Sequence, residues 1–224
     1  MSEVLNMEQL ALLSNLMYSV EFTQQTSGTD YRGESIGDIL DRLGAEIINN
    51  PGSMQNQEDW AVLINAVKDD PALSSLTLQN MNTDPAAGAP MAYFTSADNT
   101  PYLVFCGTAD HEWGYDFEGA FTSDTAVKRA TLKWVDSLNL DPNNPAIVTG
   151  HSDGGNDAMY ITVLRGDLVK LCVPFNAQQF SQEFKLKYKV LISIASEKII
   201  AINSSNDFVS AVSLENIAHM TIYI

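Results

Sequence analysis

Residues 145–164 read PAIVTGHSDGGNDAMYITVL, and this stretch constrains the fold more than any other part of the chain. A short apolar run precedes Ser152, which lies between Gly150 and Gly154 at the spacing G-x-S-x-G, and a segment compatible with a helix follows. A sharp turn from a strand into a helix requires glycines, because side chains there would collide with neighbouring backbone. The pattern therefore predicts a strand–turn–helix unit that raises the Ser152 hydroxyl above the edge of a sheet.

The segments around this unit alternate between strand and helix patterns. From residue 90 onward, apolar runs and amphipathic runs follow the order β-β-α-β-α-β-α-β, with a hairpin turn expected at Asp98 and Asn99. Residues 181–195 fit either a strand or a helix, and we favour a helix because the apolar run at 197–203 follows as a strand. This alternation predicts an α/β domain with a mostly parallel sheet covered by helices.

The N-terminal third of the chain has a different pattern, which is helical. Segments at 7–22, 35–50 and 57–70 each place apolar residues at helical spacing, with polar residues between them. An amphipathic helix must bury its apolar face against another element. We therefore expect these three segments to cover one face of the sheet.

The charged residues are distributed unevenly. The 224 residues carry a formal net charge of −16. Residues 1–127 hold 19 acidic side chains and three basic ones, whereas residues 128–224 hold nine of each sign. An acidic surface of this kind repels phosphate groups. The same surface is expected to repel anionic lipid headgroups, and we expect no nucleic-acid partner.

No segment has the pattern of a membrane span or of a secretion signal. The chain contains no run of 18 or more apolar residues, and its first segment, MSEVLNMEQLALL, is acidic where a signal peptide is basic. We therefore expect no membrane span and a cytoplasmic location, with export by an unconventional route left open.

Cysteine, histidine and acidic residues do not form a convincing metal-binding pattern. Cys106 and Cys172 lie in apolar runs and are expected to be reduced core residues, and three histidines are too few for a histidine-rich site. Five carboxylates fall within residues 110–124, but their spacing fits an EF-hand loop poorly. A solvated acidic loop is the favoured interpretation and a calcium loop the alternative, so we expect no metal and no cofactor.

Several segments resemble a known family. VTGHSDGGNDAMY resembles the nucleophile elbow of the fungal-type (class 3) triacylglycerol lipase family, and is closer still to bacterial lipase-like α/β-hydrolase domains of unassigned substrate. LVFCGTADHEW is similar to the FRGT…W segment of these proteins, with Cys106 in place of the arginine. PFNAQQF, IAINSSNDFVSAV and LALLSNLMYSV resemble the strand after the elbow, the acid loop and the first helix.

The resemblance spans most of the chain in the right order, and it implies an α/β-hydrolase-like fold. We expect a mostly parallel sheet with helices on both faces, without the C-terminal end of the fold. We expect a single domain over residues 1–224, in which residues 1–75 form a helical N-terminal cap region and residues 88–224 form the sheet core.

The resemblance also implies roles for the residues of the elbow. Ser152 is the expected nucleophile, which attacks an acyl carbonyl. Gly150, His151 and Gly154 are the expected elbow residues around it, and His151 is a packing residue there, not the catalytic base. The matching positions in this chain carry all four residue types.

Two further positions are matched to an oxyanion hole and one to the catalytic acid. The backbone N–H of Asp153, together with the N–H and hydroxyl of Thr108, is expected to bind the oxyanion. The family more often has leucine or lysine at the position of Asp153, so this carboxylate is a departure. Asp207 is the expected acid, which orients a histidine and stabilises its protonated form. An Asx-type turn is the alternative role of Asp207 in NSSND.

The catalytic base is the least certain of the expected residues. His219 follows Asp207 in the chain order of an α/β-hydrolase, but only 11 residues separate the two, and AHMTIYI has the pattern of a strand. His111, in the acidic loop, is a second candidate that does not match the base of the family. Three explanations are open: a truncated hydrolase, an inactive protein that keeps the fold, or an unusual use of His219.

Two functions of different classes follow from these expectations. The first is a serine hydrolase, lipase-like or esterase-like, that cleaves a small-molecule or lipid ester without a cofactor. The second is a catalytically inactive or truncated α/β-hydrolase module with a binding role. A third, weaker interpretation is an incomplete gene product whose exposed sheet edge favours self-association, so that a homo-oligomer is possible.

Overall fold

The computed structural model describes residues 4–52, 55–84, 86, 88–107, 125–205 and 216–224. The helices in these ranges are α1 (Met7–Leu16), α2 (Val20–Thr26), α3 (Ile36–Asn49), α4 (Gln57–Asp69), α5 (Pro71–Ser74), α6 (Ala126–Ser137), α7 (Asp153–Leu164), α8 (Gln182–Lys187) and α9 (Lys189–Ala195). The strands are β1 (Thr77–Asn82), β2 (Met91–Thr95), β3 (Pro101–Phe105), β4 (Ala146–His151), β5 (Val169–Phe175), β6 (Ile200–Asn203) and β7 (Met220–Tyr223).

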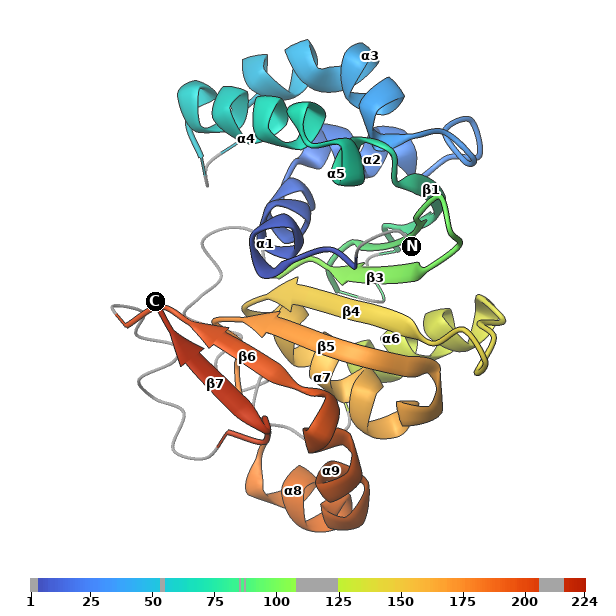
Figure 1. The fold of residues 1–224 in the computed structure, drawn as a ribbon, viewed down its shortest axis with the longest axis vertical. Coiled ribbons are helices and arrows are strands. Elements are labelled where there is room, and N and C mark those ends of the chain that lie inside the picture. The colour runs from blue at the N-terminus through green and yellow to red at the C-terminus, as the bar shows by residue number, and fades with distance from the viewer. Residues whose placement is uncertain (1–3, 53–54, 85, 87, 108–124, 206–215) are drawn as a thin grey trace.

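The strands in the described part of the chain form one seven-stranded sheet, in the order β1-β2-β3-β4-β5-β6-β7 (Figure 1). β1, β2 and β3 are antiparallel neighbours, whereas every pair from β3 to β7 is parallel. The expectation of a mostly parallel sheet is therefore confirmed. Parallel strands end at the same edge of a sheet, so the ends of β4, β5 and β6 lie together, and Ser152 directly follows β4.

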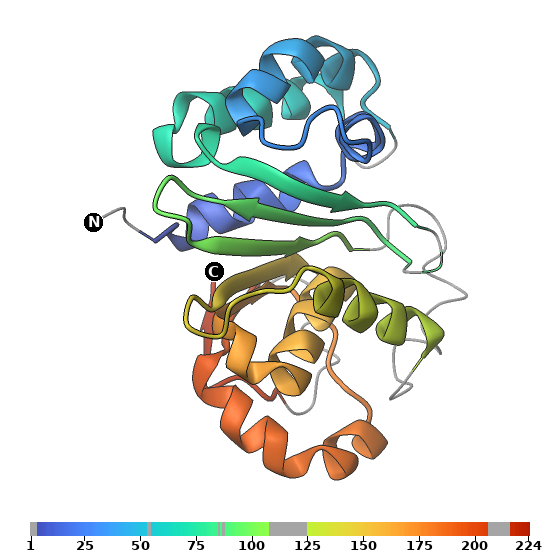
Figure 2. The same cartoon turned by 90° about the vertical axis from the view of Figure 1, so that its right-hand side faces the viewer.

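Helices cover both faces of this sheet, as expected (Figures 1 and 2). Successive side chains of a strand point to opposite faces. In β3, Tyr102 and Val104 belong to a core that includes the N-terminal helices, whereas Leu103 and Phe105 belong to a second core that includes α6 and α7. All five residues of β3 are buried, which is typical of a strand covered on both sides.

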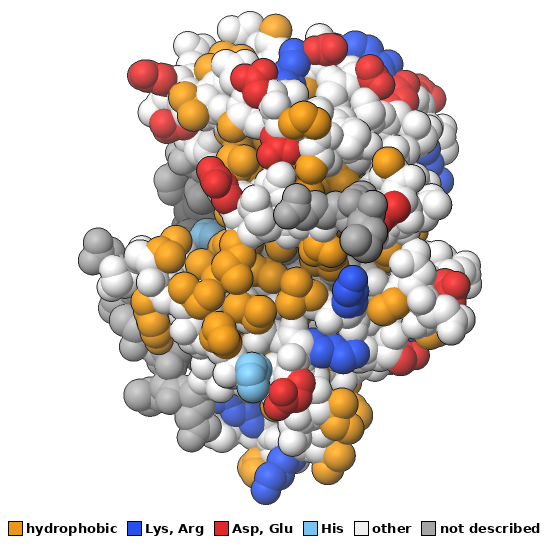
Figure 3. All heavy atoms as spheres, in the orientation of Figure 1, with side chains coloured by type: hydrophobic (Ala, Val, Ile, Leu, Met, Phe, Trp, Pro, Cys, Tyr) orange, Lys and Arg blue, Asp and Glu red, His pale blue; other side chains and the backbone are white. Residues whose placement is uncertain are grey.

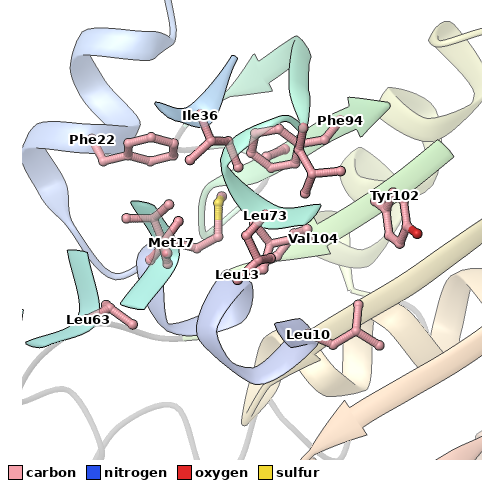
Figure 4. Close-up of a cluster of buried hydrophobic side chains, with 14 of the residues drawn as sticks. Leu10, Leu13, Met17, Phe22, Ile36, Leu63, Leu73, Phe94, Tyr102 and Val104 are labelled. Atoms are coloured by element: carbon pink, nitrogen blue, oxygen red, sulfur yellow. The ribbon is translucent and has the colours of Figure 1, made fainter. Parts of the chain in front are cut away.

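The N-terminal helices share a core with β2 and β3 (Figure 4). Side chains from α1 to α5 and from these two strands meet there: Leu10, Leu13, Met17, Phe22, Ile36, Leu63, Leu73, Phe94, Tyr102 and Val104. Because this core is continuous between the helices and the sheet, we propose that both belong to one domain, as the sequence led us to expect.

Side-chain caps decide where the N-terminal helices begin. Asn6, Ser19, Ser35 and Asn56 each accept a hydrogen bond from the backbone N–H three residues later, which satisfies an N–H that has no partner inside the helix. The cap at Ser19 explains why the single helix expected over residues 7–22 is in fact two helices, α1 and α2.

The sheet begins earlier than the sequence pattern indicates. β1 precedes the range 88–224 that we expected for the sheet core. The sequence pattern does not predict this strand, because its only apolar residues, Leu78 and Met81, are three positions apart and do not alternate. A register shift between Leu78 and Asn80 brings both apolar side chains to the same core. The helix favoured for residues 181–195 is present, and Tyr188 divides it into α8 and α9.

No helix in the described ranges is both long enough and apolar enough to cross a bilayer.

Leu13→Ala tests whether the helical region and the sheet unfold together. Leu13 is fully buried between α1 and the sheet, so removing its side chain is expected to lower the free energy of unfolding by about 2–5 kcal/mol. Urea unfolding followed by circular dichroism should show a single transition at a lower midpoint. Val62→Ala, at an exposed position of α4, should leave the midpoint almost unchanged. Two separate transitions, with only one of them shifted, would contradict the single domain.

Candidate active site

Ser152 lies at the sharp turn between β4 and α7 with an unusual backbone conformation. Its φ and ψ angles are 57° and −122°, a region that a residue with a side chain occupies only at an energetic cost. Its N–H donates to the carbonyl oxygen of Phe175 at the end of β5, at 2.9 Å, which ties the turn to the sheet. The Ser152 side chain forms no capping hydrogen bond with the described first turn of α7, so its hydroxyl is not used to begin the helix.

Glycines around Ser152 allow three backbone segments to approach one another. A Cβ atom on Gly154 would collide with the carbonyl oxygen of Phe105, and one on Gly150 would collide with that of Gly154. A Cβ atom on Gly155 would lie 2.7 Å from the Cβ of Ala177. The glycines of the elbow are therefore required by close packing of α7 against the ends of β3 and β4.

The chain that leaves β3 brings Gly107 beside Ser152. A Cβ atom on Gly107 would lie 2.6 Å from the carbonyl oxygen of His151 and 3.2 Å from the Cβ of Ser152. The next residue, Thr108, lies outside the described residues, so its expected place in the oxyanion hole stays a prediction. Asp153 is the first residue of α7, where backbone N–H groups have no partner inside a helix. The expected role of this N–H in the oxyanion hole stays a prediction, like that of Thr108.

Tyr18 connects the N-terminal helices to the elbow. It lies between α1 and α2, and its hydroxyl is 2.7 Å from Nδ1 of His151, with the two rings in an edge-to-face contact. Either group can donate this hydrogen bond, according to the imidazole tautomer. Burial, and then the nearby Cys106, raise the pKa of Tyr18, while a hydrogen bond from the N–H of Gly107 acts in the opposite direction. Tyr18 is therefore a neutral phenol that positions both His151 and Gly107.

This contact is compatible with a packing role of His151, which stays a prediction. Nδ1 of its ring is engaged with Tyr18, which leaves only the second ring nitrogen for other contacts. Sequence reasoning did not identify Tyr18. Its only signal is its place in LALLSNLMYSV, where a tyrosine on an amphipathic helix is more often an ordinary core residue.

A buried ion cluster lies behind the elbow, on the face of α7 that meets α6. Nζ of Lys128 is 2.7 Å from Oδ1 of Asp157 and 3.2 Å from Oδ1 of Asp153. Asp153 and Asp157 are four residues apart on α7, so their side chains lie on one face of the helix. The departure at Asp153 is thereby explained, because its carboxylate has a cation as its partner. Nothing in the sequence identified Lys128.

Burial prevails over the neighbouring charges at one group of this ion cluster but not at the other. It raises the pKa of Asp157 to about 6, although the Lys128 ammonium acts against this and the Asp153 carboxylate supports it. Burial alone would lower the pKa of Lys128, but the two carboxylates together raise it above its ordinary value. Lys128 is therefore charged, and the net charge of the cluster changes when Asp157 loses its proton.

His219 lies where the parallel strands begin, whereas Ser152 lies where they end. Its side chain is exposed, with Nδ1 3.4 Å from a carboxylate oxygen of Glu197, and its N–H donates to the carbonyl oxygens of Ser196 and Ile199. These residues all precede β6 or β7, whereas Ser152 follows β4.

The strand register gives the separation between these positions. His151 is paired with Phe175 and, across two further strands, lies level with Ile222 of β7. His219 precedes Ile222 by three residues. With about 4.8 Å between neighbouring strands and about 3.3 Å per residue, His219 is about 14 Å across the sheet and about 10 Å along it from His151. The structure therefore does not bring His219 to Ser152.

Asp207, His111 and the acidic stretch at 110–124 lie outside the described residues. The chain leaves β6 at the same edge of the sheet as Ser152, where the N–H of Ser204 donates to Oδ1 of Asn176 at 2.7 Å. With two strand spacings between β4 and β6, Asp207 follows a strand that ends about 10 Å from the elbow. The expected acid role of Asp207 stays a prediction.

The two cysteines match the expectation of reduced core residues. Cys106 and Cys172 are both free and buried, and burial raises the pKa of each thiol to about 12. Within the described ranges, no group of three or more histidine, cysteine, aspartate or glutamate side chains is placed to hold a metal ion.

The mostly parallel sheet, with a helix after the serine turn, is a fungal-type lipase-like α/β-hydrolase fold. Residues 73–200 match the model of the Mbeg1-like family. Since this match covers more than half of the chain, the protein belongs to the Mbeg1-like family.

Two solved structures are similar to the chain. The Lip2 lipase from Yarrowia lipolytica has a TM-score of 0.52 at 17% sequence identity, over 97% of this chain and 77% of that one. The Rhizomucor miehei lipase in a propeptide complex has a TM-score of 0.42 at 10% identity, over 95% of this chain and 66% of that one. At these identities the Lip2 likeness shows the fold alone. No curated protein sequence matches the chain.

Gly154→Ala tests whether close packing requires the elbow glycine. The new Cβ atom would meet the backbone of Phe105 and Cys106, which cannot move without disturbing β3, so we expect a loss of about 2 kcal/mol or more in unfolding free energy. Gly166→Ala is the matched control, because nothing lies within 4 Å of a Cβ atom there. Equal midpoints of urea unfolding for the two variants would contradict the described packing.

Asp157→Asn tests the buried ion cluster through the pH dependence of stability. A carboxyl whose pKa rises from 3.8 to about 6 on folding binds its proton more tightly in the folded state. Its contribution to stability is therefore full below pH 4 and is lost as the pH rises to about 6. We expect wild type to lose unfolding free energy relative to Asp157→Asn over this interval. Asp167→Asn, at an exposed position, should follow wild type, and parallel curves for all three proteins would refute the raised pKa.

Proposed function

We propose that this protein is a serine hydrolase that cleaves a carboxylic ester, with Ser152 as the nucleophile. The observation that carries the proposal is the strained backbone of Ser152 at the junction of β4 and α7, with its hydroxyl not used as a helix cap. Strain of this kind persists only where the surrounding structure maintains it, and it is concentrated at functional sites. The lipase-like fold supports the same reaction class.

The reaction would proceed by acyl transfer to Ser152. The hydroxyl oxygen attacks the carbonyl carbon of the ester, a base accepts the hydroxyl proton, and the alcohol leaves with a proton as the acyl-enzyme forms. The backbone N–H groups of Asp153 and Thr108 are the proposed donors to the oxyanion. A single donor of this kind is worth roughly 3 kcal/mol of transition-state stabilisation.

The ion cluster supports this role of Asp153. Its carboxylate would otherwise repel a negative charge on the oxyanion, but the Lys128 ammonium lies 3.2 Å from it. This pairing also holds the first turn of α7 against α6, so the N–H of Asp153 has a defined direction. We therefore propose Lys128 as a positioning residue for the oxyanion hole.

Asp207 is the proposed acid, and the identity of the base decides between two functions. Nδ1 of His151 is engaged with Tyr18, and His219 is distant in the sheet. His111 is the one histidine of the chain that lies outside the described residues. The position of His219 favours, as a second candidate function, a lipase-like module that binds a ligand without hydrolysing it.

The substrate and the location are part of the same proposal. We propose a small-molecule or lipid ester, and we choose small probes because Ser152 is only 5% exposed and neighbouring groups must move to admit a larger acyl chain. A cytoplasmic location is consistent with two free, buried cysteines, since reducing compartments keep thiols unpaired.

Labelling with a fluorophosphonate probe, together with hydrolysis of short p-nitrophenyl esters, tests the proposal. Wild type should be labelled, and Ser152→Ala should lose both labelling and hydrolysis down to the uncatalysed background. Ser193→Ala, which removes an exposed hydroxyl from α9, is the matched control and should behave as wild type. If folded wild-type protein is neither labelled nor active, the hydrolase proposal fails and the binding module is favoured.

His111→Ala and His219→Ala then identify the base. Loss of a general base reduces the rate by about 10²- to 10⁴-fold, whereas loss of a distant histidine has no such effect. We expect His219→Ala to keep its activity, because the side chain lies exposed beside Glu197. A loss of activity in His219→Ala equal to that of Ser152→Ala would contradict the described position.

A further inference from the structure

Asn176, the first residue after β5, lies between the turn at Ser152 and the end of β6. In the sheet, β5 is the strand between β4, which leads into that turn, and β6. Phe175, the last residue of β5, is paired with His151 of β4 on one side and with Ile202 of β6 on the other. Asn176 therefore occupies the point where three parallel strands end together.

One peptide group and one side chain connect these strand ends. The carbonyl oxygen of Phe175 accepts a hydrogen bond from the N–H of Ser152 at 2.9 Å. The N–H of the same peptide group, which belongs to Asn176, donates to the carbonyl oxygen of Ile202 at 2.8 Å. Oδ1 of Asn176 then accepts from the N–H of Ser204 at 2.7 Å. The backbone of Ser152 is thus linked to the end of β6 through a single peptide group.

The described backbone offers few other links between β5 and β6. Their registered pairing consists of Phe175 with Ile202, and an isolated bridge joins Cys172 to Ile199. By contrast, every residue of β4 has a partner in β5. The position of the end of β6 therefore depends strongly on the two hydrogen bonds of Asn176.

Helices do not replace this link on the face of the sheet that carries the N-terminal core. Figure 3 shows hydrophobic side chains over β5 to β7 that no helix covers on this side. Leu171, Ile200 and Ile222, one from each of these strands, pack at the border of that core and are only partly buried. On this face, in the part of the chain that the structure describes, no helix presses β6 against β5.

The link needs a residue with two properties, and asparagine has both. Asn176 has a φ of 44°, in the left-handed region, where asparagine is several-fold enriched among residues other than glycine. The N–H of Ser204 can only donate, so the atom that faces it must be the amide oxygen of the side chain. Glycine would adopt the same backbone conformation but would offer no acceptor.

We propose that Asn176 is a positioning residue that fixes the end of β6 relative to Ser152. The inference rests on the proposed function, in which Asp207, three residues after Ser204, supplies the acid. Asn176 would not touch the reacting atoms. It would act through its peptide group on Ser152 and through its side chain on Ser204. A nucleophile and an acid must keep a fixed separation, because the base has to reach both.

An ordinary turn role is the alternative for Asn176. Asparagine in a turn typically bonds the backbone of its own turn, a residue or two away. Here the partner of the side chain is 28 residues away, after another strand. The side chain of Asn176 therefore joins two strand ends and does not close its own turn.

Asn176→Gly tests the proposal, because it removes the acceptor and keeps the backbone conformation. For a short p-nitrophenyl ester, kcat should fall about 10- to 100-fold, since a small displacement of catalytic groups has an effect of this size. KM should stay almost unchanged, because the groups that contact the substrate are not altered. The midpoint of urea unfolding should stay near that of wild type, because glycine is not strained at this φ.

Two further variants separate positioning from a general effect of the substitution. Asn176→Asp keeps an oxygen acceptor at the same place and should retain most of the wild-type kcat. Asn139→Gly is the matched control, because Asn139 also has a positive φ, 52°, but is exposed after α6. Its side chain bonds only the nearby carbonyl oxygen of Ser137 among the described contacts, so this variant should behave as wild type.

Amide hydrogen exchange gives a measurement that does not need hydrolysis. The N–H of Ser204 should lose its protection in Asn176→Gly, because its acceptor is gone, and should keep it in Asn176→Asp. Both variants are measured as the full chain, by NMR, beside wild type.

The outcomes distinguish this inference from the proposed function. The inference is overturned by a wild-type kcat in Asn176→Gly, by equal losses in Asn176→Asp and Asn176→Gly, or by the same loss in Asn139→Gly. If wild type is neither labelled nor active, the proposed function fails and takes the catalytic part of the inference with it. The exchange rate of Ser204 still decides whether Asn176 fixes the end of β6, and unchanged protection in Asn176→Gly would refute that as well.

Discussion

The close approach of three backbone segments at Ser152 is the constraint on which the rest of the structure depends. The ends of β3 and β4 and the first turn of α7 meet at distances that exclude even a Cβ atom at Gly150 and Gly154. This contact requires β4 to lie beside β3, because the first turn of α7 reaches the ends of both strands. The helices that flank β4 and the elbow between them are therefore parts of one packing arrangement.

The N-terminal helices contribute to this arrangement as well as to the core. Through its hydroxyl, Tyr18 holds both His151 and the N–H of Gly107, so the turn after α1 is linked to two sides of the elbow. On the opposite face of the sheet, Lys128 binds the carboxylates of Asp153 and Asp157 and so connects α6 to α7. The backbone around Ser152 is thus supported from both faces of the sheet, by a neutral hydrogen bond on one and by ion pairs on the other.

Local sequence patterns predicted the helices, strands and turns that neighbouring residues determine. They missed the features that depend on strand pairing or on residues distant in the sequence. The strand–turn–helix around Ser152 and the alternating elements after residue 90 have strong local signals, and the structure contains them. β1 was missed because a register shift, not strict alternation, brings Leu78 and Met81 to one face. Tyr18 and Lys128 were missed because their partners lie 133 and 25 to 29 residues away, and no spacing rule connects such positions.

The conformation of Ser152 has a consequence for the stability of the protein. At a φ of 57°, a residue with a side chain has a strained backbone. Ser152→Gly would remove this strain, because glycine adopts such angles readily. In a protein with no catalytic use for Ser152, the substitution Ser152→Gly would increase the stability of the fold. A serine that acts as the proposed nucleophile would have to accept this conformational cost, which is the compromise between stability and activity known from enzymes.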